Sequence, residues 1–466
     1  MKRKTKLFIY VFAAIAFLTL MQQDIEETST KSYLLLDAIF NGTFPVGYPF
    51  ESAFYIPVHI TFAIWNLPFW ILHRFGISGP SQIINLLWAK SLVVIALIGV
   101  IYMFNKILDE AEFTGNKEFW SFVLFTSMLV FPPVFAVAQY DSIGLFFGLY
   151  GTLLAIRCED DKLSWKSLLL LSFSVSFKIF YLFPTICIIF VKNRKLKKII
   201  SSLLSCLSIS VVFVVLSKIL TKIKEARAIA TAAAIVQNSP VVVDSAEISV
   251  GMAERLFKVT FPGGYFNMSI IFVLLFGLYF AMFIGKKPET KKEKIYMIAF
   301  SCSITYLILI VFAMAHVQWS IFPGVFTILL LALSSESNKK SNYICEEIFE
   351  LSLLLQQFIF YPSIHLHEIR FDHLLLKNLN THFFSTNLTC PSMILELGGE
   401  PLTMILASLT LVAAIALFVI NNPWKVNKNN ELTSINNDVV SNNFINFRTF
   451  ILSVYVLSSL LIRLVF

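Results

Sequence analysis

The stretch AVAQYDSIGLFF, which begins at Ala136, places four polar residues between two apolar runs. These residues are Gln139, Tyr140, Asp141 and Ser142. An ionised carboxylate is strongly disfavoured in hydrocarbon unless it is paired or faces water, so an acid in this setting is a candidate for a functional site. Asp141 could also cap the helix that follows, since Asp and Ser are favoured N-cap residues. The two roles are compatible, and we expect Asp141 to contact a ligand.

Other residues with useful chemistry stand beside apolar runs elsewhere in the chain. They are Asp24, Asp37, Glu51, Lys178, Arg255, His316 and Gln318. If they meet at one face of the protein, a carboxylate that can accept a proton would lie opposite a cationic wall that can bind an anion. This combination suits the transfer of a group away from a phosphate leaving group.

Each of these residues also has a simpler interpretation. Asp24 belongs to the acidic stretch DIEE, and loop acids are usually solvated. Asp37 is better explained as an acid at a helix end or in a loop than as a second catalytic group. Lys178 and Arg255 could extend to the membrane interface, as long basic side chains do. A histidine at a helix end, such as His316, is commonplace at a surface.

The composition places the chain among membrane proteins. Of its 466 residues 57% are hydrophobic and only 14% are charged, with a mean hydropathy of +0.75, whereas soluble domains carry about a quarter charged residues. Repeated apolar runs of about 18 residues or more predict a polytopic helical membrane protein. The net charge of +8 lies in short Lys and Arg tracts between these runs, where the positive-inside rule expects it. The charge therefore indicates orientation and not a nucleic-acid partner.

About thirteen transmembrane helices are predicted, in an all-α fold. They cover about residues 7–22, 84–105, 119–137, 142–157, two within 167–191, 197–219, 268–284, 295–313, 319–334, 345–361, 402–421 and 448–465. The basic sequence KRKTK predicts a cytoplasmic N-terminus, which leaves long outer loops at 23–80, 220–266 and about 362–400. In the first of these loops, residues 56–75 mix apolar and aromatic residues with prolines, which favours an interfacial helix.

The segment 167–191 bears on this topology because a strongly basic tract follows it. It is long enough for one helix, yet KNRKLKK comes next and carries five positive charges. A single crossing would place this tract outside, so we predict two short helices broken near Lys178 and Pro184. Short interrupted segments of this kind often line a polar cavity. All the candidate residues named above can then converge at the outer face.

Four local patterns resemble those of the GT-C glycosyltransferases, polytopic enzymes that use sugars linked to polyprenyl phosphate. QQDIEETSTK, after the first helix, is similar to the D-x-E start of the family's first outer loop. AQYDSIGLFFGLYG resembles its Gln-aromatic-Asp/Asn-Ser motif. FSVSFKIFYLFP resembles its Lys-containing hairpin that ends in Pro, and AHVQWSIFPGVF its His-x-Gln-Trp turn. The patterns follow the family's order, so we expect a GT-C-like catalytic module at 1–335 and a C-terminal transmembrane region at 336–466.

The resemblance implies an inverting, single-displacement transfer of a sugar from a polyprenyl-phosphate donor to an acceptor at the extracytoplasmic face. Asp24 would deprotonate the acceptor hydroxyl while the sugar leaves phosphate. Lys178, with Arg255 or His316, would hold the phosphate. The implied substrate-binding residues are Gln139, Tyr140, Asp141, Lys178, Arg255, His316, Gln318 and Trp319. Whether the acceptor is a glycan, a lipid or a protein stays open.

No cofactor is expected, and no residue pattern indicates a metal. His365, His367 and His373 do not share one helix face, so a solvated loop is favoured over a metal site. Two alternatives from other classes stay open: a transporter or flippase of lipid-linked saccharides, and a non-catalytic membrane scaffold. A transporter would need polar residues through the membrane midplane, whereas the candidates here gather at one face.

Overall fold

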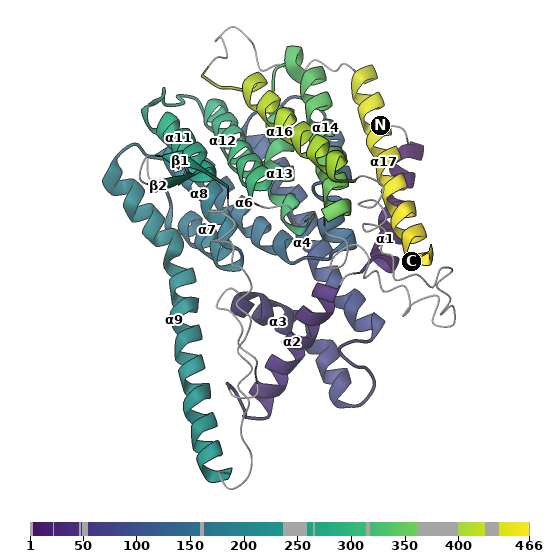
Figure 1. Cartoon of the computed structure of the whole chain (residues 1–466), viewed down its shortest axis with the longest axis vertical. Coiled ribbons are helices and arrows are strands. Elements are labelled where there is room, and N and C mark those ends of the chain that lie inside the picture. Colours follow the sequence, from purple (N-terminus) through teal and green to yellow (C-terminus); the bar gives the residue numbers. More distant parts are fainter. Residues whose placement is uncertain are drawn as a thin grey trace.

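The computed structural model describes residues 3–21, 23–45, 48, 55–158, 163–235, 259–263, 266–313, 317–360, 399–424 and 438–465. This part of the chain is a bundle of α-helices with one short pair of strands (Figure 1). The all-α fold expected from the sequence is therefore confirmed.

The elements follow one another along the chain as a series of helices with short breaks. The helices are α1 (Arg3–Thr19), α2 (Gln23–Phe40), α3 (Tyr55–Arg74), α4 (Ile83–Glu110), α5 (Lys117–Thr126), α6 (Asp141–Arg157), α7 (Trp165–Phe177), α8 (Leu182–Lys192), α9 (Leu196–Ile235), α11 (Ile270–Ile284), α12 (Lys291–Phe312), α13 (Ile321–Leu333), α14 (Glu336–Phe360), α16 (Gly399–Ile420) and α17 (Asp438–Val465). Three single turns are η1 (Pro132–Ala136), η2 (Ile179–Tyr181) and η3 (Val317–Ser320). The strands β1 (Thr260–Gly263) and β2 (Phe266–Ser269) pair antiparallel.

Six helices in the described part of the chain are long and apolar enough to cross a membrane. They cover Ile56–Arg74, Ile83–Glu110, Leu196–Ala226, Lys291–Phe312, Pro401–Ile420 and Asn442–Leu461. The bent pair of α1 and α2 would add a seventh span if it counts as one. The chain is a multi-pass membrane protein on this basis, while the total of about thirteen helices stays a prediction. Because α3 passes the same test, the interfacial position of residues 56–75 also stays a prediction.

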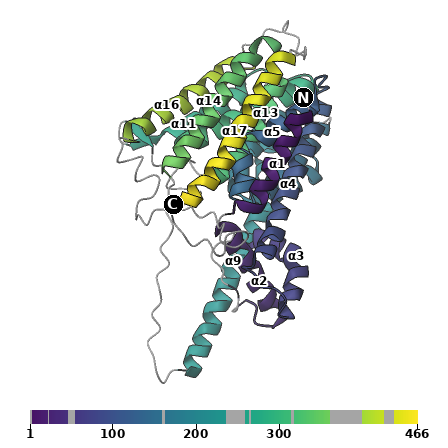
Figure 2. The same cartoon turned by 90° about the vertical axis from the view of Figure 1, so that its right-hand side faces the viewer.

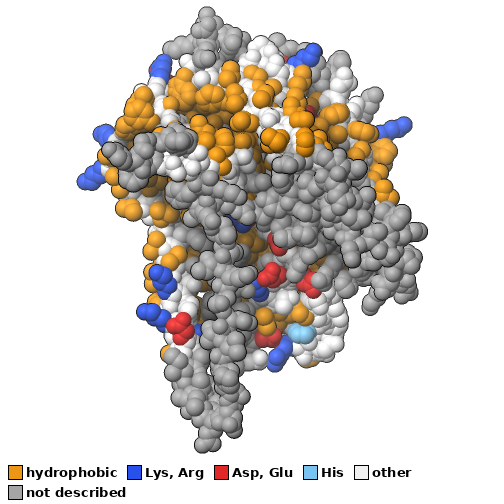
Figure 3. All heavy atoms as spheres, in the orientation of Figure 1, with side chains coloured by type: hydrophobic (Ala, Val, Ile, Leu, Met, Phe, Trp, Pro, Cys, Tyr) orange, Lys and Arg blue, Asp and Glu red, His pale blue; other side chains and the backbone are white. Residues whose placement is uncertain are grey.

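The apolar surface and the projecting helices occupy different parts of the molecule. Figure 3 shows apolar side chains in a broad zone over the upper half of one face, with a group of acidic and basic side chains below it. Helices α2 and α3 lie at the lower end, beneath the main bundle, in Figures 1 and 2. Helix α9 has 40 residues, which span about 60 Å at 1.5 Å per residue. Its far part therefore extends beyond the bundle.

The first of the expected outer loops begins with a helix, which the sequence analysis missed. Ile25, Ser29, Tyr33 and Leu36 of α2 recur at helical spacing and are all buried. Their side of α2 faces α3, where Asn66 donates hydrogen bonds to serine hydroxyls of α2. Residues 23–40 fold as a helix because this stripe is covered.

The expected single helix over 119–137 is wrong. Helix α5 ends at Thr126, and the chain resumes a helical path only in η1, a short π-helix that starts at Pro132. Pro132 and Pro133 have no N–H group, so the carbonyls of Met128 and Leu129 lose their α-helical donors. The Leu129 carbonyl instead accepts a hydrogen bond of 2.9 Å from the Ser320 hydroxyl of η3.

The predicted reversal at Lys178 is confirmed. Near the end of α7, the Ser174 hydroxyl donates to the carbonyl of Gly144, near the start of α6, at 2.6 Å; these two helices are therefore antiparallel. At the end of α8, the Lys192 ammonium donates to the carbonyl of Cys158, which directly follows α6. Helix α8 thus returns to the level from which α7 started, and the break at Lys178 forms the tip of a hairpin.

The C-terminal helices share the core of the N-terminal part. Phe349 of α14 and Leu452 of α17 belong to the same buried cluster as Val123 of α5 and Phe131. This cluster continues across the expected boundary at residue 335, which falls between α13 and α14.

Candidate functional site

The polar motifs come together where three helices begin or end. Asp24 lies in the first turn of α2, Asp141 is the first residue of α6, and Lys178 links α7 to η2. The Gln139 side-chain amide donates a hydrogen bond to Asp24 Oδ2. Lys178 Nζ lies 3.4 Å from Asp141 Oδ1. Since Gln139 and Asp141 are two residues apart, these contacts join all four side chains into one cluster, called the candidate site below.

A buried lysine binds the last carbonyls of α1 and so helps to set the position of Asp24. Lys90 of α4 is fully buried, and its ammonium donates to the carbonyls of Ala16 (3.0 Å), Phe17 (2.9 Å) and Leu20 (2.5 Å). Carbonyls in the last turn of a helix need partners from outside the helix. Helices α1 and α2 meet here at a bend of 57°. Lys90 therefore stabilises the bend that delivers Asp24 to the candidate site, and it does so through the backbone of α1.

The backbone before Asp141 is held in an unusual path. Ala138 has φ of +56°, a left-handed conformation that is uncommon for residues other than glycine and that clusters at functional sites. The backbone N–H of Gln139 donates to the carbonyl of Pro133 at 3.0 Å, which closes the turn. Ser142 anchors its other side, since its hydroxyl donates to the carbonyl of Val93 at 3.0 Å. This turn presents the Gln139 side chain to Asp24.

Asp141 is a buried acid with one ionic partner. It is 1% exposed, and no hydrogen bond from the described residues reaches either of its carboxylate oxygens. The residue at the N-cap position of α6 is Tyr140, and no side chain caps the helix. The interpretation of Asp141 as a capping residue is therefore wrong. Its carboxylate is instead held by the ion pair with Lys178.

Lys178 carries its charge among aromatic rings. Its Nζ lies 5.1 Å from the ring centre of Tyr140, 5.6 Å from that of Trp319 and 5.8 Å from that of Phe180. A cation at such distances is attracted by the electron-rich ring faces. The Lys178 side chain remains 17% exposed, so its ammonium group is held in place while part of it stays accessible.

Glycines on α6 let the hairpin approach closely enough for this ion pair. A Cβ atom at position 148 would overlap the ring of Tyr181, and one at position 144 would lie 3.0 Å from Cβ of Phe177. Phe177 and Tyr181 flank Lys178 on either side of the hairpin tip. The spacing of Gly144 and Gly148 by one helical turn therefore allows Lys178 to reach Asp141.

The structure describes only some of the other candidate residues. Trp319 is part of η3 and packs edge-to-face on Phe180, with ring centres 4.8 Å apart. Gln318 lies in the same turn, but its side chain is outside the described part of the structure, as are the whole residues Glu51, Arg255, His316, His365, His367 and His373. Asp37 is occupied elsewhere, since Trp70 Nε1 donates to it at 2.9 Å and Arg74 lies 3.8 Å away. This agrees with its interpretation as a structural acid.

The opposite end of the same helices is basic. At the end of α6, Arg157 pairs with Glu110 at 2.7 Å, and Lys291 of α12 pairs with the same carboxylate. At the start of α5, Lys117 pairs with Asp109. The candidate site and this basic rim thus occupy opposite ends of α6.

Sequence reasoning missed two residues of this site. Lys90 stands alone within the apolar run LWAKSLVV, and an ionisable residue inside a span is a signal in its own right. Nothing in the sequence distinguishes Phe180 from the other phenylalanines of the chain, which has 47 in all. Among the described residues, no group of three His, Cys, Asp or Glu side chains could hold a metal ion.

An apolar cavity of about 620 Å³ lies between α11, α12 and α16. Its lining includes Val273 and Leu274 of α11, Leu307 and Val311 of α12, and Phe418 of α16. The wall formed by α12 ends at Phe312, and η3, which carries Trp319, is the next described element along the chain.

Comparison of the chain with models of known protein families, with curated proteins and with solved structures found no match.

Proposed function

We propose that the protein is an integral membrane glycosyltransferase that transfers a sugar from a polyprenyl-phosphate donor to an acceptor on the extracytoplasmic face, with inversion. The observation that carries this proposal is the link from Asp24 through Gln139 to the Asp141–Lys178 pair. A group that can accept a proton and a cation that can hold a phosphate then belong to one cluster. The reaction requires both.

Asp24 is the proposed general base. It is partly exposed and lies in the first turn of α2, where the helix dipole favours a negative charge. The hydrogen bond from Gln139 also favours the carboxylate form. In the proposed step, Asp24 takes the proton of the acceptor hydroxyl as its oxygen bonds to the sugar C1. The bond from C1 to the phosphate oxygen breaks, and the phosphate leaves with the electron pair.

Lys178 is the proposed phosphate ligand. The buried Asp141 and the three rings around Nζ fix the position of the ammonium group, which has three N–H donors. At least one of these donors can then bind the leaving phosphate and offset its growing charge. Arg255 and His316 stay proposed partners in this task. Tyr140, Gln318 and Trp319 stay proposed contacts of the donor.

The apolar cavity between α11, α12 and α16 is the proposed seat of the isoprenoid chain of the donor. Its lining is almost wholly aliphatic and aromatic, as a hydrocarbon chain requires. Because η3 with Trp319 follows α12 in the chain, we propose that a bound lipid extends from this cavity to the candidate site with its phosphate.

The proposed orientation follows from charge. The basic rim at the end of α6 and the tract before α9 would face the cytoplasm by the positive-inside rule, which leaves the candidate site outside. Cysteine labelling tests this on α9 in a protein whose native cysteines are replaced by serine, using Lys195→Cys before its start and Lys222→Cys beyond its middle. An impermeant thiol reagent added from outside should label the second variant only. Labelling of the first variant alone would reverse the orientation.

A transfer assay tests the reaction itself. Purified protein in detergent, given radiolabelled polyprenyl-phosphate sugars and candidate acceptors, should release polyprenyl phosphate with transfer of the label. A flippase would move the labelled lipid across a vesicle bilayer without cleaving it, and a scaffold would do neither. Lipid movement without cleavage, across a panel of donor sugars, would refute the proposal.

A further inference from the structure

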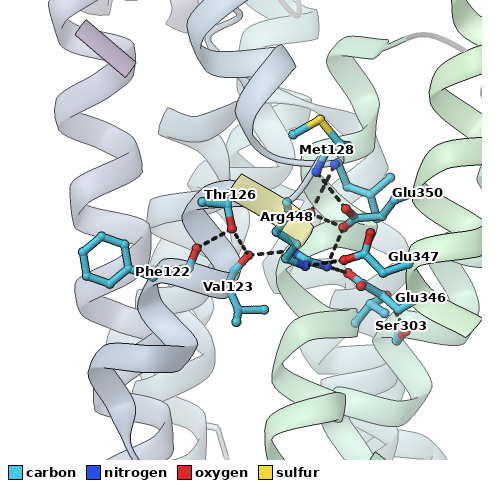
Figure 4. A network of polar contacts seen from close by, with 12 residues as sticks. Phe122, Val123, Thr126, Met128, Ser303, Glu346, Glu347, Glu350 and Arg448 are labelled. Carbon is cyan, nitrogen blue, oxygen red and sulfur yellow. Dashed lines mark hydrogen bonds and ion pairs between the residues drawn. The ribbon is translucent and has the colours of Figure 1, made fainter. Parts of the chain in front are cut away.

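A second cluster of ionisable side chains is buried among helices α5, α14 and α17, away from the candidate site. Arg448 of α17 lies among three acids of α14, Glu346, Glu347 and Glu350 (Figure 4). Its Nη2 contacts Glu346 Oε1 and lies 3.3 Å from Glu350 Oε1, while its Nε lies 2.8 Å from Glu347 Oε1. All four residues are buried. They are called the glutamate cluster below.

The formal charges of the glutamate cluster do not balance. Three carboxylates share one guanidinium, so full ionisation would leave two uncompensated negative charges in the interior. No other cation is buried with them among the described residues. Helices α13 and α16 have no Lys or Arg, and the one cation of α5, Lys117, lies at its far end. The basic residues of α1 and the lysines of α14 are exposed or paired elsewhere, Lys6 with Glu118 and Lys339 with Glu336. Like charges that share a buried site cannot all stay ionised, because repulsion and lost hydration both oppose it. The imbalance calls for a bound cation.

Glu350 has the contacts of an ionised carboxylate. Its Oε1 accepts a hydrogen bond from the Ser127 hydroxyl, and its Oε2 accepts one of 2.8 Å from the backbone N–H of Met128. Together with the guanidinium of Arg448, these donors surround both oxygens. Donors aimed at a carboxylate favour its charged form. The cation that the charge imbalance requires must therefore bind to another acid of the cluster.

Glu346 has the contacts of a neutral acid. It is 0% exposed; one of its oxygens contacts Arg448, and Oε2 has no hydrogen-bond partner in the described part of the chain. Glu346 and Glu350 approach the same Nη2 atom, so their carboxyl groups must lie near each other. A proton on Glu346 would remove the repulsion between them and would supply a donor at that point. It would reduce the surplus from two negative charges to one, which Glu347 carries, and the Glu347 side chain is 11% exposed.

We propose that the glutamate cluster is a proton-binding site in the interior of the protein, with Glu346 carrying the proton at neutral pH. A metal ion is disfavoured, because the guanidinium of Arg448 already occupies the centre of the three carboxylates. The role of the site is to hold the end of α5: Arg448 Nη1 donates to the carbonyl of Val123 at 2.7 Å, and Glu350 fixes the two residues after Thr126. The proposal is independent of any transferase activity.

Infrared spectroscopy of the purified full-length protein in nanodiscs tests the protonation directly. At neutral pH the wild type should show the carbonyl stretch of a protonated carboxylic acid, shifted in heavy water. Glu346→Gln should lose this band. Glu225→Gln, an exposed acid on α9, is the matched control and should keep it. Retention of the same band in Glu346→Gln, or its absence from the wild type, would overturn the assignment.

Thermal unfolding provides a second readout that separates the two acids. Glutamine resembles a neutral carboxylic acid, so Glu346→Gln should melt close to the wild type at neutral pH. Glu350→Gln should melt several degrees lower, since an amide cannot accept from Ser127, Met128 and Arg448 together. Equal losses in both variants would contradict the proton on Glu346. A melting point that rises with sodium but not with choline chloride, and without the infrared band, would identify a sodium site instead.

Discussion

The candidate site and the glutamate cluster use similar side chains in opposite ways. Each sets carboxylates against a single cation beside a helix break. In the glutamate cluster both oxygens of Glu350 accept hydrogen bonds, Arg448 binds the Val123 carbonyl, and all four residues are buried. In the candidate site neither carboxylate oxygen of Asp141 accepts a hydrogen bond from the described residues, and Asp24 and Lys178 keep some exposure. The buried contacts of the glutamate cluster indicate a structural role. The partial exposure of Asp24 and Lys178 indicates that the candidate site can bind a ligand.

Arg448→Met should have the largest effect of any single change. It leaves the ionised acids of α14 without a cation and the Val123 carbonyl without a donor from Arg448, and breaking a buried ion pair costs about 3–5 kcal/mol. We expect loss of most folded protein, measured by thermal unfolding in detergent. Arg448→Lys keeps the charge but cannot serve three partners through a rigid fork, so it should also be clearly destabilised. Arg448→Lys with the melting point of the wild type would show that only charge matters there.

Asp24→Asn should have the next largest effect, on turnover and not on folding. Asparagine keeps the size of the side chain but cannot accept a proton at neutral pH. A general base contributes about 10²–10⁴-fold to the rate, so the transfer rate should fall within this range while donor affinity changes by less than about tenfold.

Asp141→Asn is the matched comparison for Asp24→Asn. It removes the ionic partner of Lys178 but leaves the proposed base intact, so a milder loss of turnover is expected. A nearly silent Asp24→Asn together with an inactive Asp141→Asn would exchange the roles of the two acids.

Local patterns predicted the four clustered residues Asp24, Gln139, Asp141 and Lys178, but neither Lys90 nor Phe180. Charge tracts identify the end of each helix at which Gln139, Asp141 and Lys178 lie, and the predicted reversal at Lys178 brings that residue to the same level as Asp141. The direct bond between Gln139 and Asp24 could not be predicted, because it depends on the left-handed Ala138 and on the 57° bend that Lys90 stabilises. Both are consequences of tertiary packing.

The glutamate cluster could not be predicted from the sequence, for a different reason. Glu346 and Arg448 are 102 residues apart, on two helices, and no local pattern connects them. Helix α14 also begins at Glu336, well before the expected start near residue 345. The three glutamates are the eleventh, twelfth and fifteenth residues of this 25-residue helix and so lie near its middle. The acidic sequence EEIFE alone would suggest a helix end at the membrane surface.

Lys178→Ala should weaken the use of donor at limiting concentration by roughly 10–100-fold, the value of a hydrogen bond to a charged group. Lys178→Arg should retain part of the activity, because it keeps the charge although not the shape. The double variant Lys178→Ala with Asp141→Asn controls for the buried charge that the single change exposes. Normal kinetics of Lys178→Ala at limiting donor would leave Lys178 with a purely structural role.

Asp37→Asn should have the smallest effect, and it compares two acids of the same helix. Asp37 and Asp24 are both on α2, yet Asp37 is held by Trp70 and Arg74 of α3. Its side chain is 32% exposed, and ion pairs with such exposure contribute only about 0–1 kcal/mol. Asparagine can still accept the hydrogen bond from Trp70, so unfolding should shift slightly and transfer should stay at the level of the wild type. If Asp37→Asn instead lowers turnover as much as Asp24→Asn without changing the melting point, Asp37 would also act in catalysis, and the distinction between the structural acid of α2 and the acid in the candidate site would fail.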